Sequence, residues 1–143
     1  MNGNTSESSY VLGVNCVYHQ SSAALLRGGE LCFAVEQERF SRVKHAKAAR
    51  VDNADVLPWL AIEACLADEG IGLEDLAAVA LSFAPGRRLA MVGADPYALP
   101  PGGFGTAEGE ACFDAAVRRI PTLLAERAGD PSFAERVRFV PHH

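Results

Sequence analysis

The 143-residue sequence lacks the segments that direct a protein to or across a membrane. No stretch approaches the roughly 20 consecutive apolar residues that span a bilayer, so we expect no transmembrane helix. Residues 1–9 are polar and contain no basic segment followed by an apolar run, which argues against a secretory signal peptide. We therefore expect a cytoplasmic protein with a disordered N-terminus over residues 1–9 and one domain over residues 10–143.

Positive charge and paired cysteines are also scarce. The chain has 13 Lys and Arg against 18 Asp and Glu, and a net charge of -5 disfavours nucleic-acid binding through a general basic surface. No CxxC or other close ligand pair is present, so a zinc site is not indicated. In a reducing cytoplasm the four cysteines are expected to be small buried apolar residues: Cys16, Cys32, Cys65 and Cys112.

Apolar runs and glycines at the start of the chain predict a three-stranded antiparallel meander over residues 10–38. Residues 10–17 and 31–35 have the length and composition of buried strands. The run over residues 21–26 fits either a strand or a helix by propensity. The pair Gly28-Gly29 after it supplies the tight turn of a hairpin, which completes the meander.

The rest of the chain alternates between helix and strand. The predicted elements are a helix over 55–69, a strand over 76–83, a helix over 108–128 and a strand over 137–140. We expect Asp55 to cap the start of the first helix and Gly70 to end it, and Pro121 to kink or split the second helix. Residues 87–106 are rich in Gly and Pro and predict a long irregular loop.

The predicted order of elements is therefore β-β-β-α-β-α-β. A meander followed by alternating helices and strands predicts an α/β fold with a mixed sheet, antiparallel first and parallel later. This order resembles that of one ribonuclease-H-like half of an actin-like ATPase fold, here incomplete.

The first candidate site is the turn His19-Gln20-Ser21-Ser22, between the first two predicted strands. An imidazole, two hydroxyl groups and the backbone N–H groups of a tight turn offer donors for an anionic group. An ordinary polar hairpin turn explains the same composition, and composition alone favours that simpler interpretation.

The second candidate site is the basic run that follows Glu36-Gln37-Glu38. It contains Arg39, Arg42, Lys44, His45 and Lys47, and it is the one clear charge asymmetry in an acidic chain. Arginine gives bidentate contacts to phosphate or carboxylate oxygens and lysine gives a compact charge, so the run is suited to clamp an anion. A solvated, salt-bridged strand end is the commoner fate of such a run.

Three weaker signals remain. The pair His142-His143 follows the last predicted strand, but two adjacent histidines cannot complete a metal site. The glycine-rich residues 100–105 lack the Lys-Ser/Thr of a phosphate-binding loop, and we expect them to form a flexible cover. Cys16 and His19 suggest a thiol nucleophile with its base, but no orienting third group is visible.

Taken together, the segment VLGVNCVYHQSSAALLRGGELCFAVEQERFSRVKHAK resembles the N-terminus of the O-carbamoyltransferases that modify antibiotics and nodulation factors. That family opens with a strand ending in Gly and Asn, then His-Asp-Ser-Ala-Ala-Leu-Leu. A glycine-containing hairpin follows, then Glu-Glu-Glu-Arg-Phe-Ser/Thr-Arg-x-Lys-His. The order and spacing of both motifs are kept here, strongly over residues 11–47 and loosely over 55–141. The sequence ends at His143, inside the family's next landmark, His-His-Leu-x-His.

The resemblance implies a two-lobed actin-like domain and a second domain that makes carbamoyl-adenylate from carbamoyl phosphate and ATP. The actin-like domain transfers the carbamoyl group to a hydroxyl of a small natural-product acceptor. A divalent metal, iron or a similar transition metal, helps to hold the adenylate. On this basis the chain is expected to be an N-terminal fragment or split subunit that is inactive alone. We expect it to associate with the missing C-terminal segments as a separate chain, or with itself, through an exposed apolar surface.

By motif position, the resemblance makes His19 a candidate general base for the acceptor hydroxyl and makes Lys44 the group that stabilises anionic phosphate or the developing oxyanion. His142 would be the first metal ligand of a His-x-x-x-His pair. The candidate substrate-binding residues are Ser21, Ser22, Arg39, Arg42 and His45.

One departure from the motif lies beside the candidate base, where Gln20 replaces the usual Asp and removes a charge that would orient His19 or hold a cation. The alternative to an enzyme is a truncated, non-catalytic binding or interaction domain. A sugar kinase or a hydrogenase-maturation carbamoyltransferase is less well supported. A sugar kinase would show an Asp-x-Gly-Thr/Ser phosphate loop in place of the Glu-Gln-Glu-Arg-Phe-Ser-Arg-x-Lys-His run.

Overall fold

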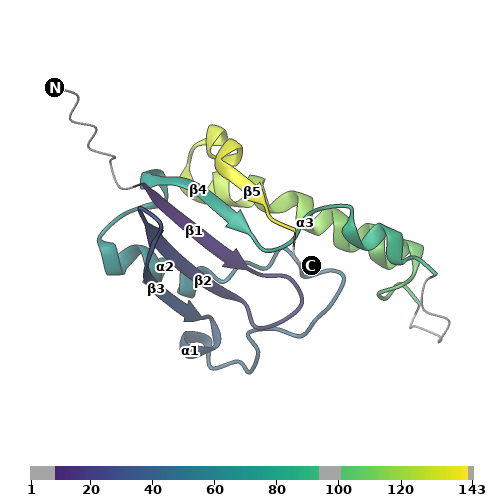
Figure 1. Ribbon diagram of the computed structural model, residues 1–143. Coiled ribbons are helices and arrows are strands. Elements are labelled where there is room, and N and C mark those ends of the chain that lie inside the picture. The colour runs from purple at the N-terminus through teal and green to yellow at the C-terminus, as the bar shows by residue number, and fades with distance from the viewer. Residues whose placement is uncertain (1–8, 94–100, 142–143) are drawn as a thin grey trace.

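A single five-stranded sheet organises the protein (Figure 1). The computed structural model describes residues 9–93 and 101–141. The strands are β1 (Tyr10–Asn15), β2 (Ser22–Arg27), β3 (Glu30–Glu36), β4 (Leu76–Leu81) and β5 (Val137–Phe139). They lie in the order β3-β2-β1-β4-β5, with β1, β2 and β3 antiparallel and with β4 and β5 parallel to β1. The expected α/β fold with a mixed sheet is confirmed.

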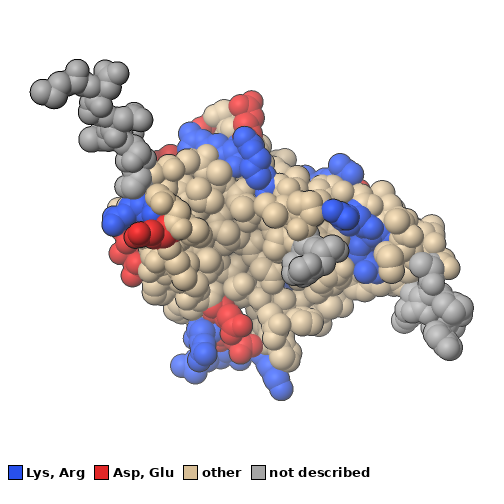
Figure 2. All heavy atoms as spheres, viewed as in Figure 1, with Lys and Arg blue, Asp and Glu red and all other residues tan. Residues whose placement is uncertain are grey.

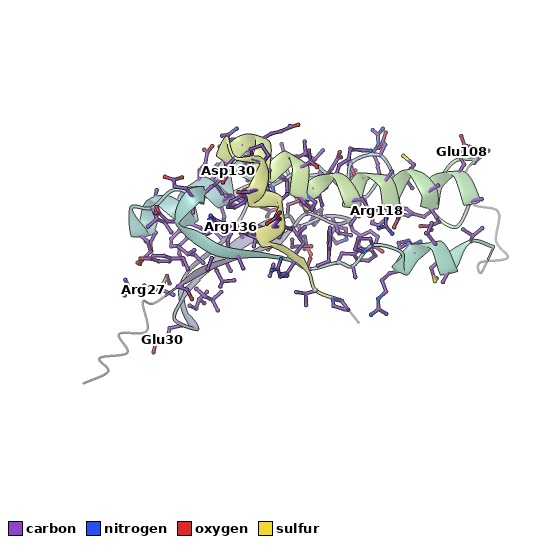
Figure 3. The ribbon with its side chains drawn as sticks, turned by 90° about the horizontal axis from the view of Figure 1, so that it is seen from above. Arg27, Glu30, Glu108, Arg118, Asp130 and Arg136 are labelled. Carbon is purple, nitrogen blue, oxygen red and sulfur yellow. The ribbon has the colours of Figure 1, made fainter. Side chains whose placement is uncertain are left out.

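Two long helices cover one face of this sheet. The α-helices are α1 (Glu38–Ser41), α2 (Trp59–Glu69) and α3 (Ala107–Ala128), and the short 3-10 helices are η1 (Leu73–Asp75), η2 (Arg87–Met91) and η3 (Pro131–Arg136). Seen from above, α3 runs along the same side of the sheet as α2 (Figure 3). None of the helices in the described residues is long and apolar enough to span a bilayer.

Alternation of side chains along the strands separates a packed face from an open one. Leu12 and Leu25 are fully buried, and they pack with Ile62 of α2 and Leu124 of α3. Residues of the opposite parity face away from the helices. Figure 2 views this open face, whose middle is largely uncharged while charged side chains gather toward its margin. The protein is therefore a two-layer arrangement with one sheet face uncovered by its described residues.

The expected start of the first long helix is wrong, and the second long helix is not split. α2 begins at Trp59 with Pro58 as its N-cap, and Asp55 instead pairs with Arg119 of α3 at 3.0 Å. The steric conflict of Pro58 with the preceding residue disfavours the helical conformation at Leu57. α3 is not split at Pro121 but runs unbroken over 22 residues, since the residues on both sides of the proline pack on one core.

The burial of the cysteines is only half as expected. Cys16 and Cys65 are buried, but Cys32 is half-buried and Cys112 is exposed. Cys112 precedes the buried Phe113 but lies on the solvent-facing side of α3. The polar side of an amphipathic helix faces water, so a cysteine at such a position is exposed. The expected irregular loop over residues 87–106 contains the short helix η2, and its residues 94–100 lie outside the described residues.

A buried ion pair fixes the start of α3. Glu110 is 0% exposed, and its carboxylate accepts hydrogen bonds from Arg88 Nε and Nη2 and from the backbone N–H of Gly105 at 2.6 Å. Burial acts to raise the pKa of Glu110, but the bonds from Arg88 and Gly105 outweigh it and lower the pKa overall. The pair thus ties η2 and the loop before α3 to the core.

We predict that Glu110→Gln lowers the free energy of unfolding by about 3 kcal/mol, because it leaves the guanidinium of Arg88 without its buried anion. The matched control is Glu63→Gln, which breaks a pair with Arg127 in which both side chains are 52% exposed, and which should cost less than about 1 kcal/mol. Urea unfolding at pH 7 measures both changes. An equal loss of unfolding free energy in the two variants would contradict a stabilising role for the buried pair of Glu110 and Arg88.

The pH dependence follows from the lowered pKa of Glu110. A carboxyl group with a depressed pKa in the folded state contributes stability above its unfolded pKa and loses it as the pH falls through the folded value. The difference in unfolding free energy between wild type and Glu110→Gln should therefore shrink as the pH falls below about 4.

Candidate functional site

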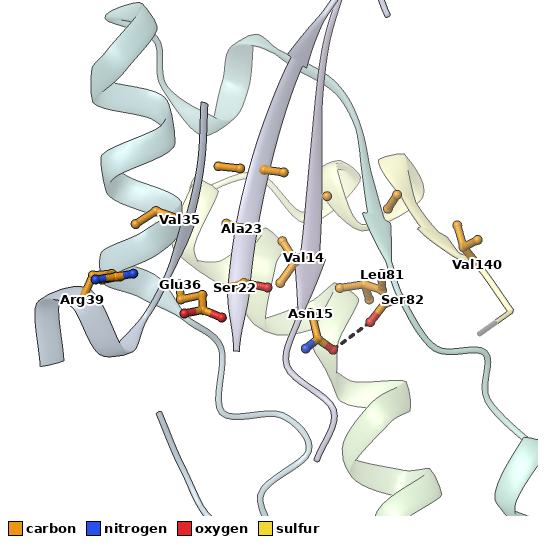
Figure 4. A pocket seen from close by; sticks show the side chains of 14 residues that line it. Val14, Asn15, Ser22, Ala23, Val35, Glu36, Arg39, Leu81, Ser82 and Val140 are labelled. Atoms are coloured by element: carbon orange, nitrogen blue, oxygen red, sulfur yellow. Dashed lines mark hydrogen bonds between the residues drawn. The ribbon is translucent and has the colours of Figure 1, made fainter. Parts of the chain in front are cut away.

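Polar side chains meet at the carboxyl ends of the parallel strands β1 and β4. Asn15 is the last residue of β1, and its Oδ1 accepts a hydrogen bond of 2.9 Å from the hydroxyl of Ser82, directly after β4 (Figure 4). The chain beyond β5 leaves from the same edge, where the Val140 N–H donates to the carbonyl oxygen of Leu81. In open α/β sheets this edge is the usual place of ligand binding.

Two hollows meet at Asn15 and Ser82. The open-face hollow, of about 660 Å³, lies on the uncovered sheet face over small residues such as Gly13, Ala24 and Ala80. Its polar lining comes from Asn15, Ser82, Ser22, Glu36 and Arg39 (Figure 4). The turn hollow, of about 420 Å³, is lined by Asn15, Val17, Tyr18, His19, Gln20, Ser82 and Phe83. The edge therefore offers an apolar floor beside a small set of polar groups, as ligand sites commonly do.

His19 stands at the outer end of the turn hollow in a constrained turn. Its neighbours Tyr18 and Gln20 have φ of 65° and 58°, in the left-handed region that non-glycine residues adopt at a cost of about 1–3 kcal/mol each. Asn15 Nδ2 donates to the carbonyl oxygen of Gln20 at 3.2 Å and, more weakly, to that of His19 at 3.5 Å. The same asparagine thus joins β4 to the turn that presents the imidazole.

The basic run reaches this turn through His45. The ring centroids of His19 and His45 are 5.8 Å apart, and the Gln20 N–H donates to the carbonyl oxygen of His45 at 2.7 Å. The His45 N–H in turn donates to Glu38 Oε2 at 2.5 Å. The fold thereby brings together His19 and His45, which lie 26 positions apart in the sequence and belong to different motifs.

The remaining cations of the run divide into a structural and a free group. Lys47 is half-buried, and its ammonium donates to the carbonyl oxygens of Asn53 and Val56; burial lowers its pKa. Arg39, Arg42 and Lys44 are exposed and form no salt bridge within residues 9–93 and 101–141. The expectation of a salt-bridged strand end therefore does not describe these three side chains.

The other predicted site residues occupy different environments. Ser22 lines the open-face hollow, whereas Ser21 is 2% exposed on the packed side and its hydroxyl has no hydrogen-bond partner in the described chain. His142 lies outside the described residues. Among the described residues, no group of three or more His, Cys, Asp or Glu side chains is placed to hold a metal.

Asn15 and Ser82 are the site residues that the sequence motifs did not identify. The available signal was their position, since each is a polar residue at the end of an apolar strand run, YVLGVN and LAAVALS. Position alone could not reveal that the two strands are parallel neighbours whose ends coincide. No sequence motif marks Tyr18 either, although its ring packs against Phe113 of α3 with a centroid distance of 5.7 Å.

Comparisons with known proteins agree with the motif resemblance. Residues 10–97, more than half of the chain, match the family model described as carbamoyltransferase N-terminus. Nodulation protein NolNO of Sinorhizobium fredii is 35% identical over 66 residues, and the uncharacterized protein sll1178 of Synechocystis is 36% identical over 67 residues. These matches cover 46% and 47% of this chain but only 8% and 10% of the two relatives.

Two further proteins are similar to this chain, one in sequence and one in structure. An uncharacterized 19.2 kDa protein of Rhizobium etli is 35% identical over 66 residues, which cover 46% of this chain and 34% of that protein. YeaZ from Pseudomonas aeruginosa has a similar structure with a TM-score of 0.46 and 16% sequence identity, covering 93% of this chain and 44% of that one.

The burial of Cys16 provides a test of whether Cys16 acts as a thiol nucleophile with His19 as its base. Burial raises the pKa of Cys16 to about 12, so at pH 8 almost none of it is the nucleophilic thiolate. Iodoacetamide should therefore label the exposed Cys112 of the native protein and leave Cys16 unmodified, as mass spectrometry of peptides would show. Cys112→Ser should abolish the fastest labelling of the native protein by iodoacetamide. Labelling of native Cys16 at a rate comparable to Cys112 would restore the thiol mechanism.

Proposed function

The chain belongs to the carbamoyltransferase N-terminus family, and on that premise we propose that it supplies one wall of an O-carbamoyl-transfer site. The observation that carries the proposal is the approach of His19 to His45 at the carboxyl edge of the sheet, beside Lys44. The matched segments of its relatives are small parts of those proteins. We propose that the chain is a fragment or split subunit that acts together with further protein and is inactive alone.

The finer fold assignment belongs to the same proposal. We propose that the domain is a ribonuclease-H-like half of an actin-like ATPase fold. A strand order of β3-β2-β1-β4-β5 supports this, with an antiparallel meander on one side of β1 and parallel strands on the other. In such an arrangement the turn after β1 and the segments after β4 and β5 share one edge, which is where His19 and Ser82 lie.

In the proposed reaction, His19 removes the proton of the acceptor hydroxyl while that oxygen forms a bond to the carbamoyl carbon. The phosphate oxygen of the activated carbamoyl group leaves as the bond to that carbon breaks. Lys44 is exposed next to His45 and forms no salt bridge within the described residues, which suits it to stabilise the negative charge on the phosphate. Gln20 supplies its backbone N–H to the carbonyl oxygen of His45, so its replacement of the family's Asp leaves that contact in place.

The co-substrates of the whole enzyme are further parts of the proposal. Family resemblance points to carbamoyl phosphate and ATP as the source of carbamoyl-adenylate, and to a natural-product hydroxyl as acceptor. A divalent metal, when bound, would supply positive charge beside the adenylate phosphate, with His142 as one ligand. Because the described residues offer no complete metal site, we assign no step to the metal.

A second candidate function is a non-catalytic interaction domain, and the uncovered sheet face favours it. The face carries the open-face hollow, with Val140 at its margin still 47% exposed. Large exposed apolar surfaces on soluble proteins commonly mark interaction sites. Both candidate functions predict that the chain associates with other protein. They differ in whether the carboxyl edge of the sheet, where His19 lies, binds an anion.

The first test measures anion binding by the full chain. Isothermal titration with carbamoyl phosphate should show binding that weakens as salt is raised, because exposed charges are screened. Lys44→Met should weaken the affinity by about tenfold through loss of a charge-assisted contact. His19→Ala should weaken it as well.

The matched control for charge is Arg27→Met. It removes a cation at the opposite end of β2, where Arg27 pairs with Glu69 at 3.0 Å, and it should leave the affinity unchanged. If the wild-type chain binds no carbamoyl phosphate, or if Arg27→Met weakens binding as much as Lys44→Met, the anion-binding role is wrong. Carbamoyl transfer by the isolated chain would refute the proposal that it acts only with further protein.

The second test concerns association through the open face. Sedimentation velocity over a range of concentrations should show self-association of the full chain. Ala24→Lys, which places a charge in the open-face hollow, should shift the equilibrium to the monomer. Ala111→Lys on the exposed side of α3 is the control and should have no effect. A chain that stays monomeric at every concentration would contradict the expectation.

A further inference from the structure

We propose that Tyr18, Arg88 and Glu110 act together as positioning residues for His19. None of the three belongs to the family motifs: Arg88 comes from the predicted irregular loop over residues 87–106, and Glu110 comes from the helix after it. The inference rests on the proposed role of His19 at the anion-binding edge. It adds the mechanism by which the fold holds that imidazole in place.

Tyr18 is the inward-facing half of the turn that carries His19. Its ring stacks on Phe113 of α3 with an interplanar angle of 19°, and it also meets Phe83 and Phe104 at centroid distances of 6.1 and 5.8 Å. His19, the next residue, is exposed. The two side chains therefore diverge from adjacent backbone positions, so that a shift of the Tyr18 ring would move the peptide that carries the imidazole.

Arg88 holds the outer end of the Tyr18 ring. Its Nη1 donates to the Tyr18 hydroxyl at 3.3 Å, and its guanidinium lies 5.9 Å from the Tyr18 ring centroid and 4.9 Å from that of Phe104. The Arg88 side chain is itself 21% exposed. One guanidinium nitrogen is thus directed at the turn, while the others are engaged elsewhere.

Glu110 fixes the orientation of the Arg88 guanidinium. Both of its carboxylate oxygens accept from Arg88, with distances of 2.9 Å to Nε and 2.7 Å to Nη2. A bidentate pair of this kind sets the plane and direction of the guanidinium. Because Glu110 is fully buried in α3, the chain of contacts from Glu110 through Arg88 to Tyr18 has a rigid base.

Core packing alone would account for the aromatic contacts, but it does not account for the hydrogen bond between Arg88 and the Tyr18 hydroxyl. The turn has left-handed residues on both sides of His19. A backbone in that region persists only where surrounding contacts determine it. Asn15 binds the turn on the side of the sheet, and the Tyr18 hydroxyl is held on the side of α3.

The test is Tyr18→Phe, which removes the hydroxyl and keeps the ring in its aromatic cluster. The matched control is Tyr10→Phe, because Tyr10 donates its hydroxyl to Glu69 at 3.0 Å within a similar Tyr–Glu–Arg network at the far end of the sheet. The first readout is nuclear magnetic resonance of the full-length chain, following the His19 imidazole and the Gln20 amide. The second is the affinity for carbamoyl phosphate.

We expect Tyr18→Phe to shift and broaden the His19 and Gln20 signals and to weaken carbamoyl phosphate binding roughly threefold to tenfold, as the loss of one hydrogen bond of ordinary strength would. Tyr10→Phe should leave both readouts as in the wild type. Circular dichroism should show both variants folded. The double variant Arg88→Met with Glu110→Gln, which leaves no buried charge unpaired, should reproduce the signal changes of Tyr18→Phe.

The outcomes separate this inference from the proposed function. Unchanged His19 and Gln20 signals in folded Tyr18→Phe would overturn the positioning role, whether or not the wild type binds carbamoyl phosphate. If the wild type fails to bind but the signals change only in Tyr18→Phe and the double variant, the positioning role stands and the anion-binding role falls.

Discussion

The parallel pairing of β1 with β4 is the constraint on which the candidate site depends. It places the ends of two strands from distant parts of the chain side by side, so that Asn15 and Ser82 form a hydrogen bond. Asn15 then uses its amide nitrogen to hold the turn that follows β1. A shift in register by one residue would send every side chain of β1 to the opposite face and remove the asparagine from this edge.

The edge combines a rigid support with exposed polar groups. Beneath the turn lie an aromatic cluster and a fully buried carboxylate, while His19, His45 and Lys44 on its outer side are exposed. Lys44, Arg39 and Arg42 form no salt bridge within the part of the chain that the structure describes, so their charge is available for an incoming anion. The cost of the left-handed backbone around His19 is offset by contacts on both of its sides.

The uncovered face of the sheet relates this chain to its longer relatives. Helices α2 and α3 cover one face only, and the other presents small residues and an open hollow. A sheet buried on both faces is the usual state of parallel strands in α/β proteins. Family membership and the uncovered face together favour a chain that works in contact with more protein, as the proposals above require.

The sequence by itself determined the α/β class, the strand-forming runs and the family, because alternation, turn glycines and motif spacing are local properties. It also indicated His19 and the basic run as candidates. Tertiary structure alone decided that His45 is the residue of that run whose ring meets His19, that Lys47 is turned inward, and that Asn15, Ser82 and Tyr18 belong to the edge. It also placed the start of α2 after Pro58 and left Cys112 exposed. These outcomes depend on which strands are neighbours and on which helix face packs inward, and such pairings between distant segments leave no mark in the spacing of residues along the chain.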